Sequence, residues 1–594
     1  MLQSATNLIS CIGLSSLLMS FFGVNSSPPD DPINCLSPKT SSHCTVSNTY
    51  GEFPDRTICE VSNVFYPKTE QELLAFVAMA SMNKTKVKVS TRYYHSIPKL
   101  ACPDGQKGNN MLISTLYLNR TLAINASTMT MTVESGATLK DVIEGSAKFG
   151  MALPNGPYWW GLTIGGLIST GAHGSSLWGV GSSVHDYIEQ LRIITPAGRN
   201  EGYAKIRTID NSHPHINAAK VSLGVLGVIS QVTLRLDPMF KRSITMYQSD
   251  DSDLAEQAVS FGKKYEFADI TWYPSQQKAV YRIDDRVSSN VSGNGLNNFI
   301  GFRSTPSLLM AIIRSLEESQ ESTRDANGKC ITAKMTTSIL TKAGLGFTND
   351  GKTFKGYPVI GFQNRLQASG SCLDSPHDNQ ITACPWDHRL KSQYFHQTTI
   401  SIALSNVKNF IEDIQKLRDI EPQSFCNAEL YNGILMRYVK ASNAYLGKQE
   451  DAIDFDITYY RSKNPNKPRL HEDVFEEVEQ LGIFKYGGIP HWGKNRNVAF
   501  EGVIRKFAKA GEFLKVKNIY DPFGIFSSEW TDQILGLNGG VSLVKGGCAL
   551  EGLCICSDDL HCAPEKGYFC RPGRVFKDAR VCRHLNKSDS QSLI

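Results

Sequence analysis

Apolar and polar residues from residue 57 to residue 239 alternate in short segments that predict an α+β unit. Val87-Lys88-Val89-Ser90 and residues 129–133 have the two-residue period of a strand. Residues 70–77 and 139–149 are expected to be helices, the first one capped by Thr69 with Glu72 three residues later. We therefore expect short strands, glycine corners and few long helices in this part of the chain.

The pattern changes over residues 240–480, where strands are expected to alternate with longer helices. Residues 268–273 and 398–402 read as strands, and residues 407–420 as a helix. The segment from residue 292 to residue 394 is polar and is expected to be an irregular insertion. Residues 481–540 return to mixed structure, so the chain predicts a second domain followed by a return segment.

A glycine-rich stretch, residues 161–179, interrupts the first unit. It holds six glycines and five serines or threonines in nineteen positions. Glycine has no Cβ atom, so a phosphate group can approach the backbone N–H groups of such a stretch. A phosphate-bearing cofactor is therefore one expected ligand. The alternative is a tight turn between two buried strands, and composition alone does not decide between them. The chain has neither the G-x-G-x-x-G nor the G-x-x-x-x-G-K-[ST] motif, which disfavours NAD in a doubly wound sheet.

Composition is that of a folded globular protein of several units. The 594 residues are 41% hydrophobic and 20% charged, and the net charge of +5 is spread without a dense Lys/Arg run. This distribution argues against a nucleic-acid partner. Beyond the N-terminus, no run approaches the roughly 20 apolar residues of a membrane span, so no stable membrane span is expected.

The N-terminus predicts secretion. Residues 8–24 are mostly apolar and small or breaker residues follow, so residues 1–26 are interpreted as a signal peptide; an uncleaved anchor is the alternative, because the charged start is missing. Fourteen cysteines remain besides Cys11, an even number that suits an oxidising compartment. Downstream of the expected signal peptide, the sequence also holds five N-glycosylation sequons, at Asn83, Asn119, Asn125, Asn290 and Asn586. We expect a secreted glycoprotein.

The last segment, residues 546–594, is expected to be a small disulfide-rich tail. Six of its first 37 residues are cysteines and it has little apolar content. Six cysteines allow fifteen pairings, and the sequence does not choose among them. Zinc is a competing reading, which secretion and the lack of C-x-x-C pairs disfavour. The tail is expected either to bind an extracellular partner or to be a disulfide-linked extension without a binding role.

Three motifs occur in an order that resembles a known family. They are Val89-Ser90-Thr91-Arg92-Tyr93-Tyr94-His95-Ser96, Ile164-Gly165-Gly166-Leu167-Ile168-Ser169-Thr170-Gly171-Ala172-His173-Gly174-Ser175, and Pro490-His491-Trp492-Gly493-Lys494. Together they resemble the vanillyl-alcohol-oxidase flavoprotein superfamily, and within it the aldonolactone oxidases of the plant L-gulono-1,4-lactone oxidase type. The similarity covers roughly residues 57–535. Asp521-Pro522-Phe523-Gly524-Ile525-Phe526 is expected to return the chain to the flavin domain.

The resemblance implies a fold and a cofactor. The expected fold is a two-subdomain PCMH-type FAD-binding domain at residues 57–239, with an antiparallel-sheet substrate domain at residues 240–480. The cofactor would be FAD, whose pyrophosphate needs neutralising donors. Implied cofactor-binding residues are His95, Ser96, Thr163, Gly165, Gly166, Thr170, Gly171, His173, Gly174, Ser175 and Ile229. His95 stands where relatives often bind the flavin covalently, but Arg92, Tyr93 and Tyr94 replace the usual glycines, so a covalent link stays one of two alternatives.

The resemblance also implies the catalytic residues. Lys494 would approach the flavin edge and stabilise negative charge there. Arg437 and Thr458 would contact the substrate. The family's Glu-x-Arg pair is Leu435-Met436-Arg437 in this chain, so the carboxylate is missing. Asp456 lies on the same strand face as Thr458 and is hypothesised to replace it.

The implied reaction is FAD-dependent oxidation of an aldono-1,4-lactone at C2, with hydride transfer to the flavin and oxygen reduced to hydrogen peroxide. L-gulono-1,4-lactone would give a 2-keto lactone that enolises to ascorbate. No metal is implied, because His173, His185 and His491 have no ligand spacing. Two alternatives stay open: oxidation of another polyol, sugar or cytokinin-like substrate, or a weakly active flavoprotein that acts through a wall-binding tail.

Overall fold

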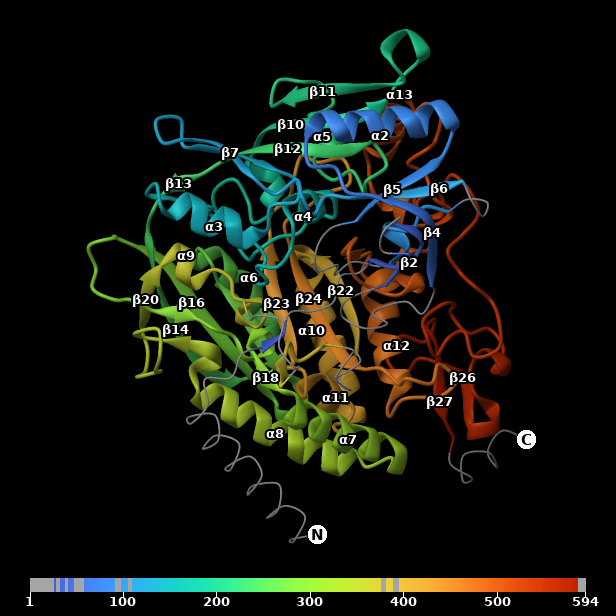
Figure 1. The fold of residues 1–594 in the computed structure, drawn as a ribbon. Coiled ribbons are helices and arrows are strands. Elements are labelled where there is room, and N and C mark those ends of the chain that lie inside the picture. Colours follow the sequence, from blue (N-terminus) through green and yellow to red (C-terminus); the bar gives the residue numbers. More distant parts are fainter. Residues whose placement is uncertain are drawn as a thin grey trace.

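The fold is taken from a computed structural model, which describes residues 26–27, 33–37, 41–47, 58–90, 98–104, 109–374, 381–387 and 395–585. His95, Ser96, nearly all of the expected signal peptide and the sequon at Asn586 lie outside these residues. The described part places a pair of smaller sheets above one large sheet, with two long helices below it (Figure 1).

The first sheet mixes parallel and antiparallel strands. Its order is β2 (Ile33–Ser37), β3 (Ser42–Val46), β4 (Cys59–Phe65), β6 (Asn110–Ser114) and β5 (Lys86–Ser90). Helix α2 (Glu70–Asn83) connects β4 to β5 and buries Leu73 and Val77. Its N-cap is Thr69, as predicted. Since β2 pairs with β3 and β3 with β4, two strands that precede residue 57, the boundary expected from the sequence, belong to this sheet.

The second sheet is antiparallel throughout. Its order is β11 (Ala204–Asp210), β10 (Ile188–Pro196), β12 (Val228–Arg235), β8 (Thr130–Glu134) and β7 (Thr121–Asn125). The helix predicted at residues 139–149 is α3 (Leu139–Ala147). The glycine-rich stretch is not only a turn, because it contains the short helix α4 (Ile164–Ser169), which packs on β12.

The large sheet has eight strands, and every neighbouring pair is antiparallel, as expected for the substrate domain. Its order is β20 (Val359–Phe362), β14 (Lys241–Asp250), β16 (Lys278–Val287), β15 (Asp269–Tyr273), β23 (Ile434–Val439), β24 (Ala452–Tyr460), β22 (Phe395–Ala403) and β25 (Ile489–Pro490). One face carries apolar residues such as Ile270, Met436 and Phe455, which share a core with α6 (Leu254–Lys264) and α10 (Leu404–Ile420). Side chains alternate along a strand, so the opposite face carries the polar residues.

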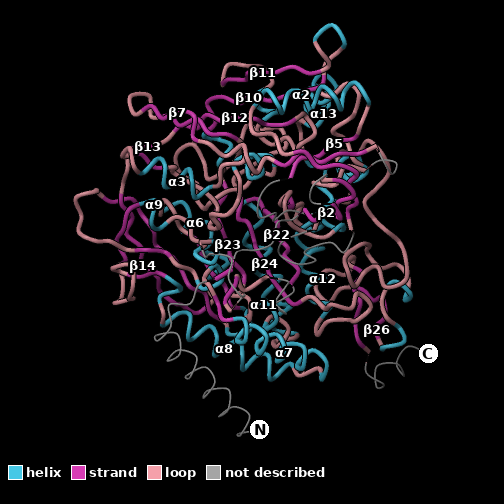
Figure 2. The backbone as a smooth tube through the Cα atoms, in the orientation of Figure 1, coloured by secondary structure: helices cyan, strands magenta, loops and turns pink. Residues whose placement is uncertain are grey.

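The insertion expected to be irregular is in fact helical. Helices α7 (Ser307–Thr323) and α8 (Ala326–Lys342) form a hairpin below the large sheet, coloured yellow-green in Figure 1 and cyan in Figure 2. A disulfide between Cys330 and Cys426 ties α8 to the short helix α11 (Cys426–Glu429). The expectation of irregular structure at residues 292–394 was therefore wrong over these two helices.

The return segment reaches the first sheet again, as predicted. After α13 (Ala510–Tyr520), the backbone N–H of Val87 donates to the carbonyl of Ile525 at 2.8 Å. The Lys88 ammonium donates to the carbonyl of Phe526 at 2.6 Å. These bonds join residues 438 positions apart and close the chain onto its first domain.

The cysteine-rich tail packs on the substrate domain. Its disulfides are Cys548–Cys554, Cys556–Cys570 and Cys562–Cys582, which use all six of its sulfurs. Its hairpin of β26 (Tyr568–Pro572) and β27 (Arg580–His584) covers helix α12 (Glu472–Gln480), whose nine residues are all buried. The Glu477 carboxylate accepts the N–H groups of Arg574, Val575 and Phe576 at 2.6, 2.6 and 2.7 Å. The tail is thus a disulfide module, as expected, but it is an integral part of the domain.

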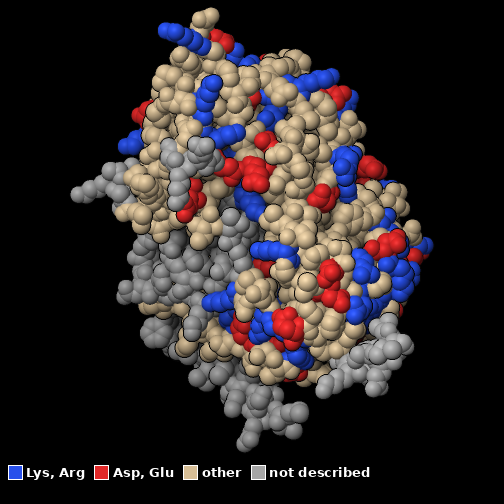
Figure 3. Space-filling model, turned by 90° about the vertical axis from the view of Figure 1, so that its right-hand side faces the viewer, with Lys and Arg blue, Asp and Glu red and all other residues tan. Residues whose placement is uncertain are grey.

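On the side of the molecule that carries the tail, basic and acidic side chains are interspersed (Figure 3). Among the described helices, none combines the length and apolar character needed to cross a bilayer. The remaining short elements are β1 (Ser26–Ser27), β9 (Met151–Ala152), β13 (Asp237–Pro238), β17 (Leu296–Asn297), β18 (Thr305–Pro306), β19 (Phe347–Thr348), β21 (Thr382–Ala383), α5 (Ile216–Ala219), α9 (Gln363–Leu366) and α14 (Glu529–Ile534).

Candidate active site

A continuous cavity of about 1200 Å³ connects the glycine-rich stretch with the polar face of the large sheet. We refer to it as the central cavity. Six of the residues expected to bind the cofactor line it, namely Thr163, Gly165, Gly166, Thr170, His173 and Ile229. The three residues expected to be catalytic, Arg437, Thr458 and Lys494, line it as well. The fold therefore brings together two groups of residues that lie more than 200 positions apart.

The glycine side of the cavity fits a large polar cofactor. The hydroxyls of Ser135 and Thr163 are buried, line the cavity, and have no hydrogen-bond partner within the protein. Buried hydroxyls are normally bonded, so these two groups indicate a ligand that supplies the missing partner. Gly165 and Gly166 lie beside them and keep side chains out of the space. This donor set suits FAD.

Three expected cofactor residues have structural contacts instead. Gly171, Gly174 and Ser175 are not among the described residues that line the cavity. Gly171 has a φ of 70° and turns the chain after α4. The N–H of Gly174 donates to the carbonyl of Ser182 at 2.9 Å. The Ser175 hydroxyl accepts the N–H of Tyr438 at 2.9 Å and donates to Ala268, so this residue joins the glycine-rich stretch to the large sheet.

His173 connects the same two parts from inside the cavity wall. Its Nε2 lies 2.6 Å from Oδ2 of Asp454 on β24, and its carbonyl accepts from Arg437 Nη1 at 3.2 Å. Burial lowers the pKa of His173, although Asp454 opposes this shift. The imidazole is thus committed to a contact within the protein. His173 positions Arg437 as well as lining the cavity.

The sheet side of the cavity is organised around the Asp456 carboxylate. Lys494 Nζ lies 2.6 Å from its Oδ2, and Arg437 Nη2 lies 3.3 Å from the same oxygen. Gln397 donates to the other oxygen at 2.7 Å. Burial alone would raise the pKa of Asp456, but Lys494 and Arg437 outweigh it and lower that pKa. The carboxylate is therefore ionised at neutral pH.

Lys494 follows the short strand β25 and points at this carboxylate. Its side chain is only 14% exposed, and burial lowers its pKa although Asp456 opposes the shift. The buried Nε of Arg437 has no hydrogen-bond partner within the protein, so at least this donor of the side chain is available to a ligand. Thr458 lies two residues beyond Asp456 on the same face and is half-buried. These groups can hold a polyhydroxylated molecule and balance negative charge beside it.

Leu435 lies directly opposite Asp456 in the pairing of β23 with β24. Both residues line the cavity. The position where relatives were expected to carry a carboxylate is therefore apolar, and a carboxylate stands on the neighbouring strand. This arrangement agrees with the hypothesis that Asp456 replaces the missing glutamate.

Sequence reasoning missed a second polar cluster in the cavity wall. The Tyr158 hydroxyl donates to Asp269 Oδ2 at 2.5 Å and accepts from Arg282 Nη2 at 2.6 Å. Asp269 is paired with Arg437 in the sheet register. The signal available was the charged residue Asp269 at the start of β15, together with Arg282 and Asp284 two positions apart on β16. Such residues mark a polar face turned to a cavity.

Three parts of the chain match the models of known protein families. Residues 61–201 match the model of an FAD binding domain. Residues 387–534 match D-arabinono-1,4-lactone oxidase, and residues 545–584 match the C-terminal domain of L-gulonolactone oxidase 2-like proteins. The tail is therefore shared with these relatives.

Full-length similarity is high. Probable L-gulonolactone oxidase 6 of Arabidopsis thaliana is 60% identical over 96% of this chain and 94% of its own. L-gulonolactone oxidase 2 of the same plant is 59% identical, with 97% of both chains covered. A more distant relative is L-gulono-1,4-lactone dehydrogenase of Mycobacterium tuberculosis, which is 24% identical over 83% of this chain and 100% of its own.

Cholesterol oxidase from Brevibacterium sterolicum has a similar structure, with a TM-score of 0.63 over 86% of this chain and 100% of its own. At 15% identity this likeness shows the fold alone, which is the two-subdomain PCMH-type FAD-binding architecture with a sheet-based substrate domain. The family matches and the fit of the cavity identify FAD as the cofactor. The chain therefore belongs to the L-gulonolactone oxidase family of FAD-dependent oxidoreductases.

Proposed function

We propose that this protein oxidises an aldono-1,4-lactone, with L-gulono-1,4-lactone as the first candidate substrate. The observation that carries this proposal is the group of Lys494, Asp456 and Arg437 in the same cavity as the unpartnered hydroxyls of Ser135 and Thr163. When bound, FAD supplies the acceptor for the hydride that leaves the substrate carbon. Oxygen is the proposed final acceptor, reduced to hydrogen peroxide.

Arg437 and Thr458 are proposed to bind the substrate. The Nε of Arg437 is a buried donor without a protein partner, so a substrate oxygen would satisfy it. Thr458 offers a hydroxyl, which can donate to one substrate oxygen and accept from another. Both side chains lie on one face of the large sheet, whose strands keep them at fixed positions. A rigid face of this kind orients the ring of a small polyol.

Lys494 is proposed to stabilise negative charge that develops in the cavity during the reaction. A fixed ammonium in a water-poor site is worth far more than the same charge in water. Asp456 is proposed to position Lys494 and Arg437, since one carboxylate oxygen contacts both cations. Because its pKa is lowered, Asp456 is a weak base, and its charge matters more than its ability to take a proton.

The reaction balances without a further reactant. The substrate loses two electrons and two protons when its C2 hydroxyl becomes a carbonyl, and oxygen takes up both as hydrogen peroxide. The resulting 2-keto lactone enolises to ascorbate. Ascorbate biosynthesis therefore fits both the proposed chemistry and the family.

We propose in addition that the protein is a secreted glycoprotein. The apolar N-terminal residues 8–24 support an export signal. Seven disulfides join all fourteen cysteines from Cys35 to Cys582, as suits an oxidising compartment. The four sequon asparagines within the described residues, Asn83, Asn119, Asn125 and Asn290, are all exposed. An extracellular partner of the tail stays a prediction, and it would use the surface of the tail that does not cover α12.

A substrate panel tests the proposed reaction. Purified protein is supplied with L-gulono-1,4-lactone, L-galactono-1,4-lactone, sugar alcohols and a cytokinin, and peroxide release is measured for each. We expect peroxide with the lactones and at least tenfold less with the sugar alcohols and the cytokinin. Peroxide from one of the other compounds alone would replace the lactone with that substrate class. If none of them reduces the flavin, the proposed function is wrong.

A further inference from the structure

The hairpin of α7 and α8 buries several charged side chains and exposes several large apolar ones, the opposite of an ordinary pair of surface helices. Arg314, Glu317 and Glu321 of α7 are buried, whereas Leu308 and Ile312 are 74% and 41% exposed. Helix α8 buries Lys329 and leaves Ile339 45% exposed. A surface helix normally turns its apolar side inward. An exposed apolar face therefore needs a reason.

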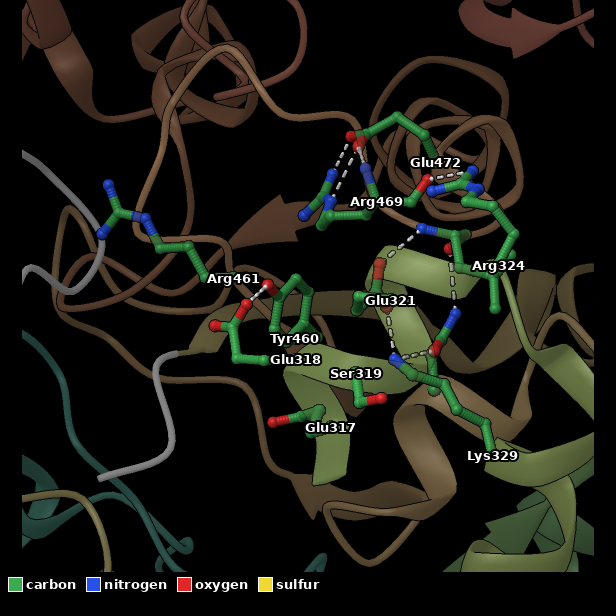
Figure 4. Close-up of polar contacts among 12 residues, drawn as sticks. Glu317, Glu318, Ser319, Glu321, Arg324, Lys329, Tyr460, Arg461, Arg469 and Glu472 are labelled. Atoms are coloured by element: carbon green, nitrogen blue, oxygen red, sulfur yellow. Dashed lines mark hydrogen bonds and ion pairs between the residues drawn. The ribbon is translucent and has the colours of Figure 1, made fainter. Parts of the chain in front are cut away.

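Polar contacts fix the hairpin in this orientation (Figure 4). The Lys329 ammonium is paired with Glu321 and donates to the Asn427 side chain at 2.7 Å. The N–H of Leu470 donates to the other oxygen of Glu321 at 2.8 Å. The Tyr460 hydroxyl donates to Glu318 at 2.9 Å. Removing one partner of such a buried pair is costly, so the network keeps the hairpin in this orientation.

That apolar face forms one end of the central cavity. Leu309, Ile312, Ile313, Leu316, Ile339 and Leu340 of the hairpin all line it. Met246 on β14, Leu345 and Phe347 continue the same wall toward the sheet. Leu435 connects this wall to the catalytic groups, because it faces Asp456 across the β23–β24 pairing. The apolar wall therefore begins beside Asp456, at the position where the family resemblance predicts a glutamate.

An aldonolactone makes no use of such a wall, because each of its carbons carries an oxygen. We propose that the preferred substrate is a lactone or sugar that carries an apolar substituent, such as an acyl or aryl group, bound along α7 and α8. Its polar ring would lie at Arg437, Thr458 and Asp456. This inference rests on the proposed function and specifies its substrate class. A membrane or a partner protein would meet only the outermost side chains, whereas the wall includes buried Met310 and Leu340 and reaches the site.

The test compares L-gulono-1,4-lactone with its 6-O-octanoyl ester, which carries the acyl group on the primary hydroxyl of the side chain, using kcat/KM for flavin reduction. We expect the ester to be at least about tenfold better, mostly through KM, since several methylenes gain an apolar wall. Ile313→Gln is expected to reduce the ratio of the two kcat/KM values to about one third or less. Ile519→Gln, a change at an exposed position of α13 outside the cavity, serves as the matched control and should leave the ratio unchanged.

The outcomes distinguish the proposed apolar site from the proposed reaction. If the lactone reduces the flavin and the ester is no better, the apolar site is overturned and the proposed function stands. If neither compound reduces the flavin, the melting temperature with each compound is measured instead. A rise with the ester alone, lost in Ile313→Gln, supports the site and overturns the proposed reaction. If neither compound raises the melting temperature, the proposed apolar site is overturned as well. Binding to phosphatidylcholine vesicles that depends on Ile313, without any preference for the ester, would replace the substrate site by a membrane contact.

Discussion

Lys494 and Asp456 form an ion pair of 2.6 Å between Nζ and Oδ2 at the wall of the central cavity. The lysine follows β25 and the aspartate stands on β24, and β22 lies between these two strands in the large sheet. Arg437 shares the same carboxylate oxygen. One carboxylate thus sets the position of both cations, and it does so in a chain in which leucine replaces the expected glutamate.

Asp456→Asn removes the negative charge and keeps the shape. The pKa of Lys494 is lowered by burial and supported by Asp456, so loss of this support lowers it further. The ammonium is then lost at a lower pH, and the alkaline limb of the kcat profile moves to lower pH. We expect kcat at neutral pH to fall by about tenfold or more. A pH profile identical to that of the wild type would show that Asp456 does not act through Lys494.

The Ser135 and Thr163 hydroxyls are expected to bind FAD. Ser135→Ala and Thr163→Val should each weaken FAD binding by a factor of about 2 to 10, the value of one hydrogen bond. Flavin content of the purified variants and the recovery on added FAD measure this effect. Ser182→Ala is the control, because its hydroxyl is also buried and unpartnered but lies outside the cavity. An equal loss of flavin in that control would point to a folding defect.

The tail is expected to stabilise the oxidase fold. Glu477→Gln leaves one acceptor oxygen for three N–H groups, so it should lower the free energy of unfolding by about 1–3 kcal/mol. Urea unfolding followed by fluorescence gives this quantity. Glu565→Gln, at an exposed side chain of the same module, should change it by less than about 0.5 kcal/mol. Equal effects of the two changes would mean that the contact of the tail with α12 does not contribute specifically to the free energy of unfolding.

A covalent bond between His95 and FAD is the alternative that the family resemblance left open. If it forms, the yellow colour stays with the protein after acid precipitation, and His95→Ala releases it into the supernatant. Peptide mapping of the coloured fragment checks the attachment residue. Colour in the supernatant of the wild type would show that the cofactor is bound without a covalent link.

Local patterns predicted much of this fold. Strand β5 and helices α3 and α10 lie within a few residues of their predicted positions, and the capped helix α2 begins as expected. These elements carry their own alternation and caps, so sequence suffices for them. The hairpin of α7 and α8 could not be predicted in this way. Most of its buried residues are polar and several of its large apolar residues are exposed, so the pattern that normally marks a helix is largely reversed.

The candidate site was predicted in part for a similar reason. Arg437, Thr458 and Lys494 came from motifs, and the fold places them in one cavity. The contacts of Tyr158 with Asp269 and Arg282 join three separate segments, and no local sequence pattern predicts contacts between residues so far apart in the chain. The acceptance of tail N–H groups by Glu477 is equally remote in sequence. Ser175 looked like a cofactor ligand because it ends the motif, yet its hydroxyl holds the two domains together.

The most direct test of the account is anaerobic mixing of the protein with L-gulono-1,4-lactone, followed by absorbance of the flavin near 450 nm. We expect the wild type to lose this absorbance, and Lys494→Met to do so about 100- to 1000-fold more slowly while keeping its FAD. Lys408→Met, at an exposed lysine of α10, should behave as the wild type. Equal rates in Lys494→Met and wild type, or no bleaching of the wild type by any aldonolactone, would contradict the account.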